Sequence, residues 1–194
     1  MKHFSLGTRG FTLIEVIIGA LISVTVISGG LNFYSNMHGA VLSQIDISEL
    51  QHRGRTTLDE ISRNLRTAGF RLPAGHPPYE ITGDSLVVYG RGTQPVDTIH
   101  YFLEEFTAAE YALVPGLPDS TSVYNLMKKV NGGLADVYSD YIFSIDYVPV
   151  NGWQVAIMVT TIAARVDRTY AMNNGFRTTS IGQVVDIRNL NLGT

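Results

Sequence analysis

The fold is decided by residues 7–27, which read Gly7-Thr-Arg-Gly-Phe-Thr-Leu-Ile-Glu-Val-Ile-Ile-Gly-Ala-Leu-Ile-Ser-Val-Thr-Val-Ile27. A basic leader is followed by a glycine–phenylalanine junction and then by an apolar run from Phe11 to Leu31, in which Glu15 is the only ionisable residue. A helix over this run, at ~1.5 Å per residue, is about 31 Å long and can cross the hydrocarbon core of a bilayer. We therefore expect residues 11–31 to form a transmembrane helix.

The leader sets the expected orientation. Residues 1–10 carry Lys2, His3 and Arg9 and no acid, which is the charge bias of the cytoplasmic side of a first membrane segment. The competing interpretation is a secretory signal peptide. The length of the apolar run, the acid inside it and the lack of an Ala-x-Ala-like cleavage site argue against that reading.

Glu15 is the anomaly in the apolar run. A carboxylate at the bilayer centre costs about 2.5–3.5 kcal/mol on insertion scales, and less near the interface, so such an acid usually has a partner and a function. The alternative is an interfacial acid whose side chain reaches back to water.

The junction Arg9-Gly10-Phe11-Thr12-Leu13-Ile14-Glu15 resembles the recognition sequence of the type IV pilin superfamily, which includes pilins and the pseudopilins of type II secretion. The resemblance covers about 20 residues. It implies that a membrane aspartic peptidase cuts between Gly10 and Phe11 and N-methylates Phe11. The new amine and the Glu15 carboxylate of an adjacent subunit could then neutralise each other in lipid, and this pairing would select one register during assembly.

The apolar helix is expected to continue beyond the membrane as an amphipathic helix and to end near Ala68. Apolar residues recur at mostly helical spacing at Val41, Leu42, Ile45, Leu50, Leu58, Ile61, Leu65 and Ala68. The pairs Glu49–Arg53 and Asp59–Arg63 are favourable i,i+4 ion pairs. Thr56 or Thr57 with Glu60 could form a capping box and break the helix, but we favour one continuous helix. Gly69 is the expected stop, and Pro73 lies beyond the end.

Two weaker patterns resemble the PilW-like group of minor pilins. One is Ile61-Ser-Arg-Asn-Leu-Arg-Thr-Ala-Gly-Phe70, and the other is Val184-Val-Asp-Ile-Arg-Asn189. These two patterns favour a minor pilin over a major one. Major pilins often carry a proline in the helix, and the resemblance does not extend to that feature, since the chain has no proline before Pro73.

The expected fold class is α+β, a long N-terminal helix packed on a mainly antiparallel β-sheet head, as in pilins. The expected division is a leader at 1–10, a transmembrane half of the helix at 11–31, an amphipathic half at 32–70 and a β-rich extracytoplasmic head at 71–194. Within the head, a Pro- and Gly-rich loop is expected at 71–80 and another loop at 168–179. Strands are expected at 85–89, 98–103, 111–114, 122–130, 141–148, 154–166 and 181–190, with residues 141–148 and 154–166 forming the best hairpin.

The head shows no pattern typical of catalysis, a metal site or a cofactor site. The chain has no cysteine, and we expect ordinary surface or core roles for the histidines His3, His38, His52, His76 and His100. Some pseudopilins bind calcium, but the acids Asp136, Asp140 and Asp146 form no EF-hand loop and are expected to be solvated. Arg165, Asp167 and Arg168 are expected to be a charged strand end.

Nucleic-acid binding is not expected either. The chain has 17 acidic and 14 basic residues, a pI near 5.9 and no basic stripe between its aromatic residues. The aromatic side chains are therefore interpreted as core and edge packing, at Tyr138, Tyr141, Phe143, Tyr147 and Trp153.

The resemblance implies a minor pilin in the cytoplasmic membrane, with its N-terminus inside and its head outside, that enters a pilus fibre and helps to initiate or cap it. The implied partners are other minor and major pilins, the prepilin peptidase and methyltransferase, and the inner-membrane assembly platform. A GspJ-like minor pseudopilin of a type II secretion system is the alternative within the superfamily. A membrane-anchored extracytoplasmic binding protein or enzyme is the alternative of another class.

Overall fold

The computed structural model describes residues 11–73, 75–90, 96–117, 121–167, 170 and 175–188. The chain forms two compact units, residues 1–44 and residues 45–194. We call the second unit the head unit. The expected cleavage site residue Gly10, the leader residues Lys2, His3 and Arg9, and Arg168 lie outside the described residues.

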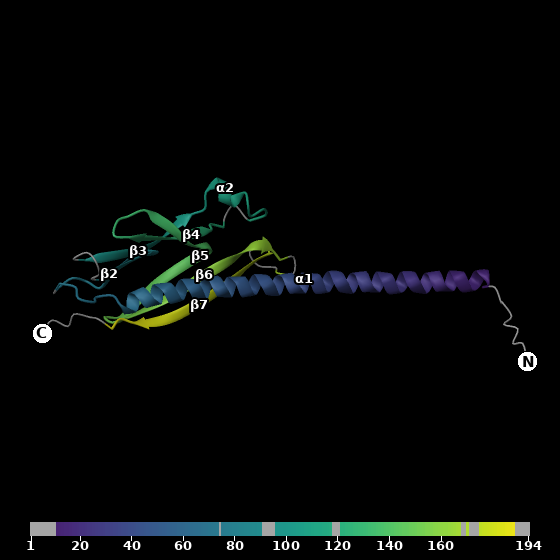
Figure 1. The fold of residues 1–194 in the computed structure, drawn as a ribbon, viewed down its shortest axis with the longest axis horizontal. Helices are drawn as coiled ribbons and strands as arrows, with labels where there is room; N and C mark the ends of the chain where they lie inside the picture. The colour runs from purple at the N-terminus through teal and green to yellow at the C-terminus, as the bar shows by residue number, and fades with distance from the viewer. Residues whose placement is uncertain are drawn as a thin grey trace, which may run out of the picture. The chain divides into compact units, whose positions relative to one another are not determined.

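Helix α1 spans Leu13–Arg66 without interruption (Figure 1), which confirms one continuous helix. The possible break at Thr56 or Thr57 does not occur, and Thr57 is instead buried inside the head unit. The helix ends at Arg66, two residues before the expected Ala68. Gly69 has a φ of 80°, in the left-handed region that glycine tolerates, and its N–H donates to the Tyr89 carbonyl at 2.9 Å, so that the chain turns away from the helix there.

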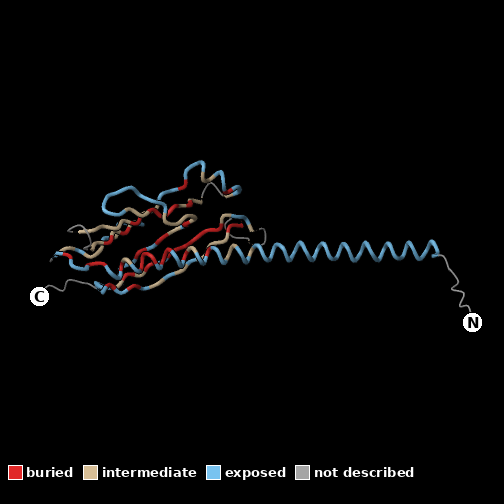
Figure 2. The backbone as a smooth tube through the Cα atoms, viewed as in Figure 1, coloured by how far each residue is buried: buried red, intermediate tan, exposed pale blue. Residues whose placement is uncertain are grey.

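The part of α1 in the first unit exposes its side chains on all sides (Figure 2). Its apolar window is long and apolar enough to cross a membrane, and none of that window is buried. The hydroxyl groups in this window bond within the helix, since Ser23 Oγ donates to the Gly19 carbonyl at 2.7 Å and Thr25 Oγ1 donates to the Leu21 carbonyl at 3.1 Å. A helix with an apolar surface and internally satisfied polar groups is compatible with membrane anchoring.

The head unit contains a seven-stranded antiparallel sheet in the order β1-β2-β3-β4-β5-β6-β7. Its strands are β1 Tyr79–Thr82, β2 Ser85–Gly90, β3 Asp97–Glu105, β4 Tyr124–Val130, β5 Ala135–Asn151, β6 Gln154–Val166 and β7 Phe176–Asp186. Together with α1, this sheet confirms the α+β fold class. The expected hairpin is confirmed as β5–β6, and β6 has the expected bounds.

Three expectations about the head were wrong. Residues 111–114 are not a strand, because the capping box of Thr107 and Glu110 starts the short helix α2, Ala108–Tyr111. The loop expected at 71–80 ends in β1, because Tyr79–Thr82 pairs with β2. The last strand begins at Phe176, inside the loop expected at 168–179, and ends at Asp186, while Leu190 lies outside the described residues.

Strand β5 bends at the point where its pairing partner changes from β4 to β6. Its first part pairs with β4 and its second part pairs with β6, and both ladders meet at Ile142. Tyr141, just before this point, has a φ of 54°. A bulky residue rarely adopts this conformation, which turns the chain more sharply than a regular strand does.

The main core lies between α1 and the sheet. The helix contributes Leu58, Ile61 and Leu65, which pack with buried side chains of the strands at Leu86, Tyr101, Leu126, Ile142, Ile145, Val155, Ile157 and Val159. A second, smaller cluster contains Phe106, Val114, Val123, Ile162 and Phe176. The buried segments of α1 and the strands are the red parts of Figure 2.

Candidate functional site at the start of helix α1

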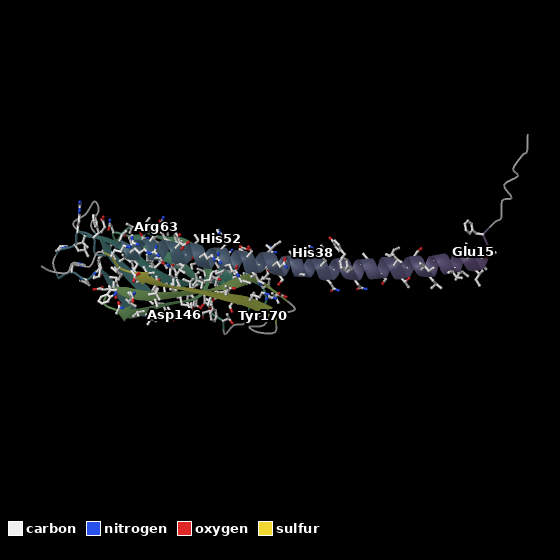
Figure 3. The ribbon with its side chains drawn as sticks, turned by 90° about the horizontal axis from the view of Figure 1, so that it is seen from below. Glu15, His38, His52, Arg63, Asp146 and Tyr170 are labelled. Carbon is white, nitrogen blue, oxygen red and sulfur yellow. The ribbon has the colours of Figure 1, made fainter. Side chains whose placement is uncertain are left out.

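Glu15 lies at the start of α1 (Figure 3), where it interacts with Thr12. The Thr12 N–H and Thr12 Oγ1 both donate to Glu15 Oε2 at 3.0 Å, and the Glu15 N–H donates to Thr12 Oγ1 at 3.4 Å. This reciprocal arrangement is a capping box, which satisfies backbone donors that have no partner inside the helix. The spacing Thr12-x-x-Glu15 carries that signal, but it was missed from the sequence because Glu15 was considered as a partner for an amine or as an interfacial acid.

The capping box gives the Glu15 carboxylate hydrogen-bond partners at the start of its own helix. These bonds offset part of the cost of an acid in an apolar segment. The Phe11 side chain is 86% exposed. Phe11 and Glu15 are therefore both available to another molecule at this end of the helix, while Gly10 lies outside the described residues.

Among the described residues of the head unit, the most buried acid is Glu60, whose side chain is only 7% exposed. Its carboxylate accepts hydrogen bonds from Lys128 Nζ at 2.6 Å and from Asn64 Nδ2 at 3.0 Å, and it also pairs with Arg63 Nη2. Asn64 Nδ2 donates as well to the Tyr101 hydroxyl at 2.6 Å. Burial raises the pKa of this tyrosine to about 12, so it stays protonated. The Glu60 cluster joins the helix to β3 and β4.

A second cluster centres on Arg53. Its guanidinium binds Glu49 Oε1 at 2.6 Å and Asp140 Oδ1 at 3.2 Å and lies 4.7 Å from the ring centroid of Tyr141. The expected Glu49–Arg53 pair is thus confirmed. Asp140, expected to be solvated, is instead an ion-pair partner of the helix, because the bend of β5 brings it to Arg53.

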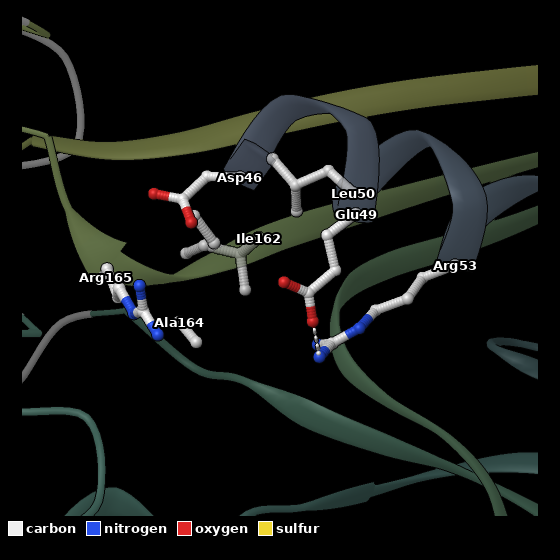
Figure 4. A pocket seen from close by; sticks show the side chains of 8 residues that line it. Asp46, Glu49, Leu50, Arg53, Ile162, Ala164 and Arg165 are labelled. Atoms are coloured by element: carbon white, nitrogen blue, oxygen red, sulfur yellow. Dashed lines mark hydrogen bonds and ion pairs between the residues drawn. The ribbon is translucent and has the colours of Figure 1, made fainter. Parts of the chain in front are cut away.

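A pocket of about 110 Å³ lies beside Arg53, between α1 and β6 (Figure 4). Its lining residues come from one stretch of the helix and from the end of the strand: Asp46, Glu49, Leu50, Arg53, Ile162, Ala163, Ala164 and Arg165. Leu50, Ile162 and Ala163 are buried, whereas the charged residues stand around the opening. The pocket can hold one small apolar group with charges beside it.

The other candidate residues do not converge on a site within the part of the chain that the structure describes. There, no group of three or more His, Cys, Asp or Glu side chains could hold a metal ion. His38 stacks on Tyr34 with ring centroids 6.0 Å apart, and His100 Nε2 lies 2.6 Å from Ser85 Oγ. Asp136 and Asp146 are exposed on β5.

The expected charged strand end and the aromatic residues are also accounted for. Asp167 binds Arg177 at 2.6 Å. Of the aromatic side chains, Tyr147 belongs to the main core, Tyr141 packs against Phe106 in the smaller cluster, and Trp153 is exposed at the β5–β6 turn.

Comparisons with protein-family models, with curated proteins and with solved structures found no match.

Proposed function

We propose that this protein is a minor pilin of a type IV pilus, a structural subunit that assembles through its N-terminal helix and helps to initiate or cap the fibre. The observation that carries the proposal is the junction Gly10-Phe11 with Glu15 four residues later, at the start of an apolar helix whose other end packs in the head unit. An anchor alone requires no acid at a set distance from a glycine. A polymer built by stacking of helices does require a feature that selects one register.

The capping box supports this proposal in a specific way. Before cleavage, Glu15 bonds to Thr12 of its own chain. Cleavage after Gly10 would create an amine on Phe11, one residue before Thr12, and would thereby introduce a cation at the same end of the helix. Glu15 would then exchange a neutral partner for a charged one, which forms a stronger hydrogen bond. Processing would therefore change the preferred partner of Glu15 at the moment when assembly begins.

The head unit is attached to α1 in a way that suits a domain carried into a fibre by its helix. Leu58, Ile61 and Leu65 of α1 lie in its core, so the sheet is carried rigidly by the C-terminal part of the helix. The proposed partners are other minor and major pilins, the prepilin peptidase and methyltransferase, and the assembly platform of the inner membrane. The proposed location is the cytoplasmic membrane, with the head outside, and then the fibre.

A GspJ-like pseudopilin of a type II secretion system would have the same junction and the same fold class. The two proposals differ in the consequence of losing the protein: loss of surface pili in one case and loss of protein secretion in the other. A deletion strain scored for both phenotypes separates them.

The direct test of processing is intact mass spectrometry of the protein from its own membranes. The expected product lacks residues 1–10 and carries one methyl group on Phe11. A chain that still begins at Met1, or that is cut elsewhere, would refute the processing and the assembly that depends on it.

The assembly role of Glu15 is tested by Glu15→Ala. We expect this variant to be cleaved and to keep a folded head but to be absent from sheared fibres. Thr12→Val is the matched control, since it removes the capping hydroxyl and keeps the carboxylate, and we expect it to assemble. Normal incorporation of Glu15→Ala would refute the register role of Glu15, whereas absence of the unaltered protein from sheared fibres would favour the membrane-anchored binding protein or enzyme.

A further inference from the structure

The β4–β5 hairpin ends in an exposed segment, residues 130–137, which reads Val-Asn-Gly-Gly-Leu-Ala-Asp-Val and which we call the arm. Leu134 at its tip is 92% exposed, more than any other large apolar side chain among the described residues. Val130 and Val137 beside it are also exposed. Val130, Leu134 and Val137 line one surface hollow together, and a contiguous exposed apolar patch of this kind is typical of an interaction site.

The arm is held in place by Asn131. The Asn131 N–H donates to the Thr98 carbonyl at 2.9 Å, and the Thr98 N–H donates to Asn131 Oδ1 at 2.8 Å. Asn131 Nδ2 also donates to Asp97 Oδ1 at 2.8 Å, and the Gly133 N–H donates to the Val130 carbonyl at 2.9 Å. The turn before Leu134 is thus tied to β3. A group held in its binding conformation loses little entropy when it docks.

The pocket beside Arg53 matches the tip of the arm in size. Its volume, about 110 Å³, is of the same order as the roughly 150 Å³ cavity that accommodates benzene in a protein core. Leu50 and Ile162 give it an apolar lining (Figure 4), to which buried Ala163 adds. One aliphatic side chain such as that of Leu134 fits this space.

The charges around the two surfaces are complementary. Arg53 is engaged by Glu49 and Asp140, but Arg165 and Asp46 take part in none of the ion pairs found among the described residues. On the arm, Asp136 follows Leu134 by two residues. On the partner strand, Lys129 lies opposite Ala135. Each surface therefore offers one carboxylate and one cation next to its apolar centre, and docking can bring Asp136 to Arg165 and Lys129 to Asp46.

The arm and the pocket lie at different ends of the head unit (Figure 1). The arm continues from Lys128, which contacts Glu60 of α1, whereas the pocket is lined by Leu50 of the same helix. Leu50 and Glu60 are about 15 Å apart along the helix axis. One head cannot fill its own pocket with its own arm.

We propose that Leu134 of one copy docks in the Arg53-side pocket of a second copy, so that heads associate head to tail. A head-to-tail contact is heterologous, and its repetition generates a row of subunits that stays open unless the rotation between successive subunits closes it into a ring. The contact involves the head unit alone, so it does not depend on processing of the leader, and either proposal can fail without the other.

The chain has no cysteine, which makes disulfide cross-linking the direct test. The variant Leu134→Cys/Ala164→Cys places one thiol on the arm and one at the pocket. The full chain in its membrane is oxidised mildly and examined by gel electrophoresis without reductant. We expect a ladder of dimers, trimers and longer species. An internal disulfide requires Cα atoms within about 7 Å, which the separation of the two sites excludes.

Leu134→Cys/Val184→Cys is the matched control, since Val184 is exposed on β7 away from the pocket. We expect it to give no ladder. Arg165→Asp in the cross-linking variant should slow ladder formation about two- to fivefold, the range of an exposed ion pair, and a further Asp136→Arg should restore it.

Three results would overturn the proposal. The first is the absence of a ladder. The second is an equal ladder from the Val184 control, which would show random collision. The third is a single dimer from Leu134→Cys alone at the same rate, which would place two arms against each other.

Discussion

Removing the Glu60 carboxylate tests whether the helix is locked to the sheet by its buried charges. Glu60→Ala leaves Lys128 without its acceptor at 2.6 Å and Asn64 without one at 3.0 Å. Breaking a buried pair by removing one partner costs about 3–5 kcal/mol. The Lys128 side chain is 26% exposed and can regain water, and Asn64 keeps its bond to the Tyr101 hydroxyl. We therefore expect the lower end, about 3 kcal/mol.

A loss of that size should lower the melting temperature by about 6–12 °C for a chain of this length. The measurement is thermal unfolding of the full chain in detergent, followed by near-UV circular dichroism. Glu49→Ala is the matched control on the same helix. Its side chain is 54% exposed and its pair with Arg53 lies at the surface, so we expect a change of no more than about 1 kcal/mol.

A double-mutant cycle isolates the pair itself. Lys128→Ala alone leaves Glu60 buried with fewer donors, whereas Glu60→Ala/Lys128→Ala removes both charges. The stability loss of the double variant should therefore be about 0.5–3 kcal/mol smaller than the sum of the losses of the two single variants. Two results would refute the idea that this cluster stabilises the packing of the helix on the sheet. One is additive stability losses in the cycle, and the other is an equal melting temperature for Glu60→Ala and Glu49→Ala.

Two further substitutions probe single features of the head. Gly132→Ala should lower the free energy of unfolding by about 1 kcal/mol, because the φ of 70° at Gly132 disfavours a side chain although no atom lies within 4 Å. Gly152 is equally open but lacks a positive φ, so Gly152→Ala should leave the melting temperature unchanged. Burial, and then the charge of Lys129, hold the pKa of His100 below its ordinary value of 6.5, so the folded protein binds this proton less readily than the unfolded chain. Stability should therefore fall as the pH drops below about 6.5. His100→Gln should weaken the dependence of the melting temperature on pH in this range, and an unchanged dependence would show that His100 is not its source.

Features that depend on neighbouring residues could be predicted from the sequence. The helix, its continuation past Thr57, its end near Gly69 and the strand Gln154–Val166 all follow from the spacing of apolar residues and from a glycine at a turn. The error at residues 111–114 was also local. The apolar spacing there was read as a strand, although Thr107 and Glu110 carried a helix-start signal.

Features that join distant residues could not be predicted. In the sequence, Glu60 was considered only as a possible capping partner of Thr56 or Thr57, and its burial beside Lys128 of β4 became visible only in the structure. Asp140 looked like a loop acid until the bend at Tyr141 brought it to Arg53. Strand β1 has only four residues, so its existence depends on pairing with β2 rather than on its own sequence pattern.

By itself, the sequence determined the apolar helix, the junction at Gly10-Phe11 with its acid at Glu15, and the alternation that makes most strands, because these are properties of residues close together along the chain. The tertiary structure alone decided that Lys128 pairs with Glu60 of α1, that one end of the head carries an exposed leucine and that the other holds a pocket of matching size. The physical reason is that burial and pairing depend on which distant segments meet, and composition and periodicity do not specify that.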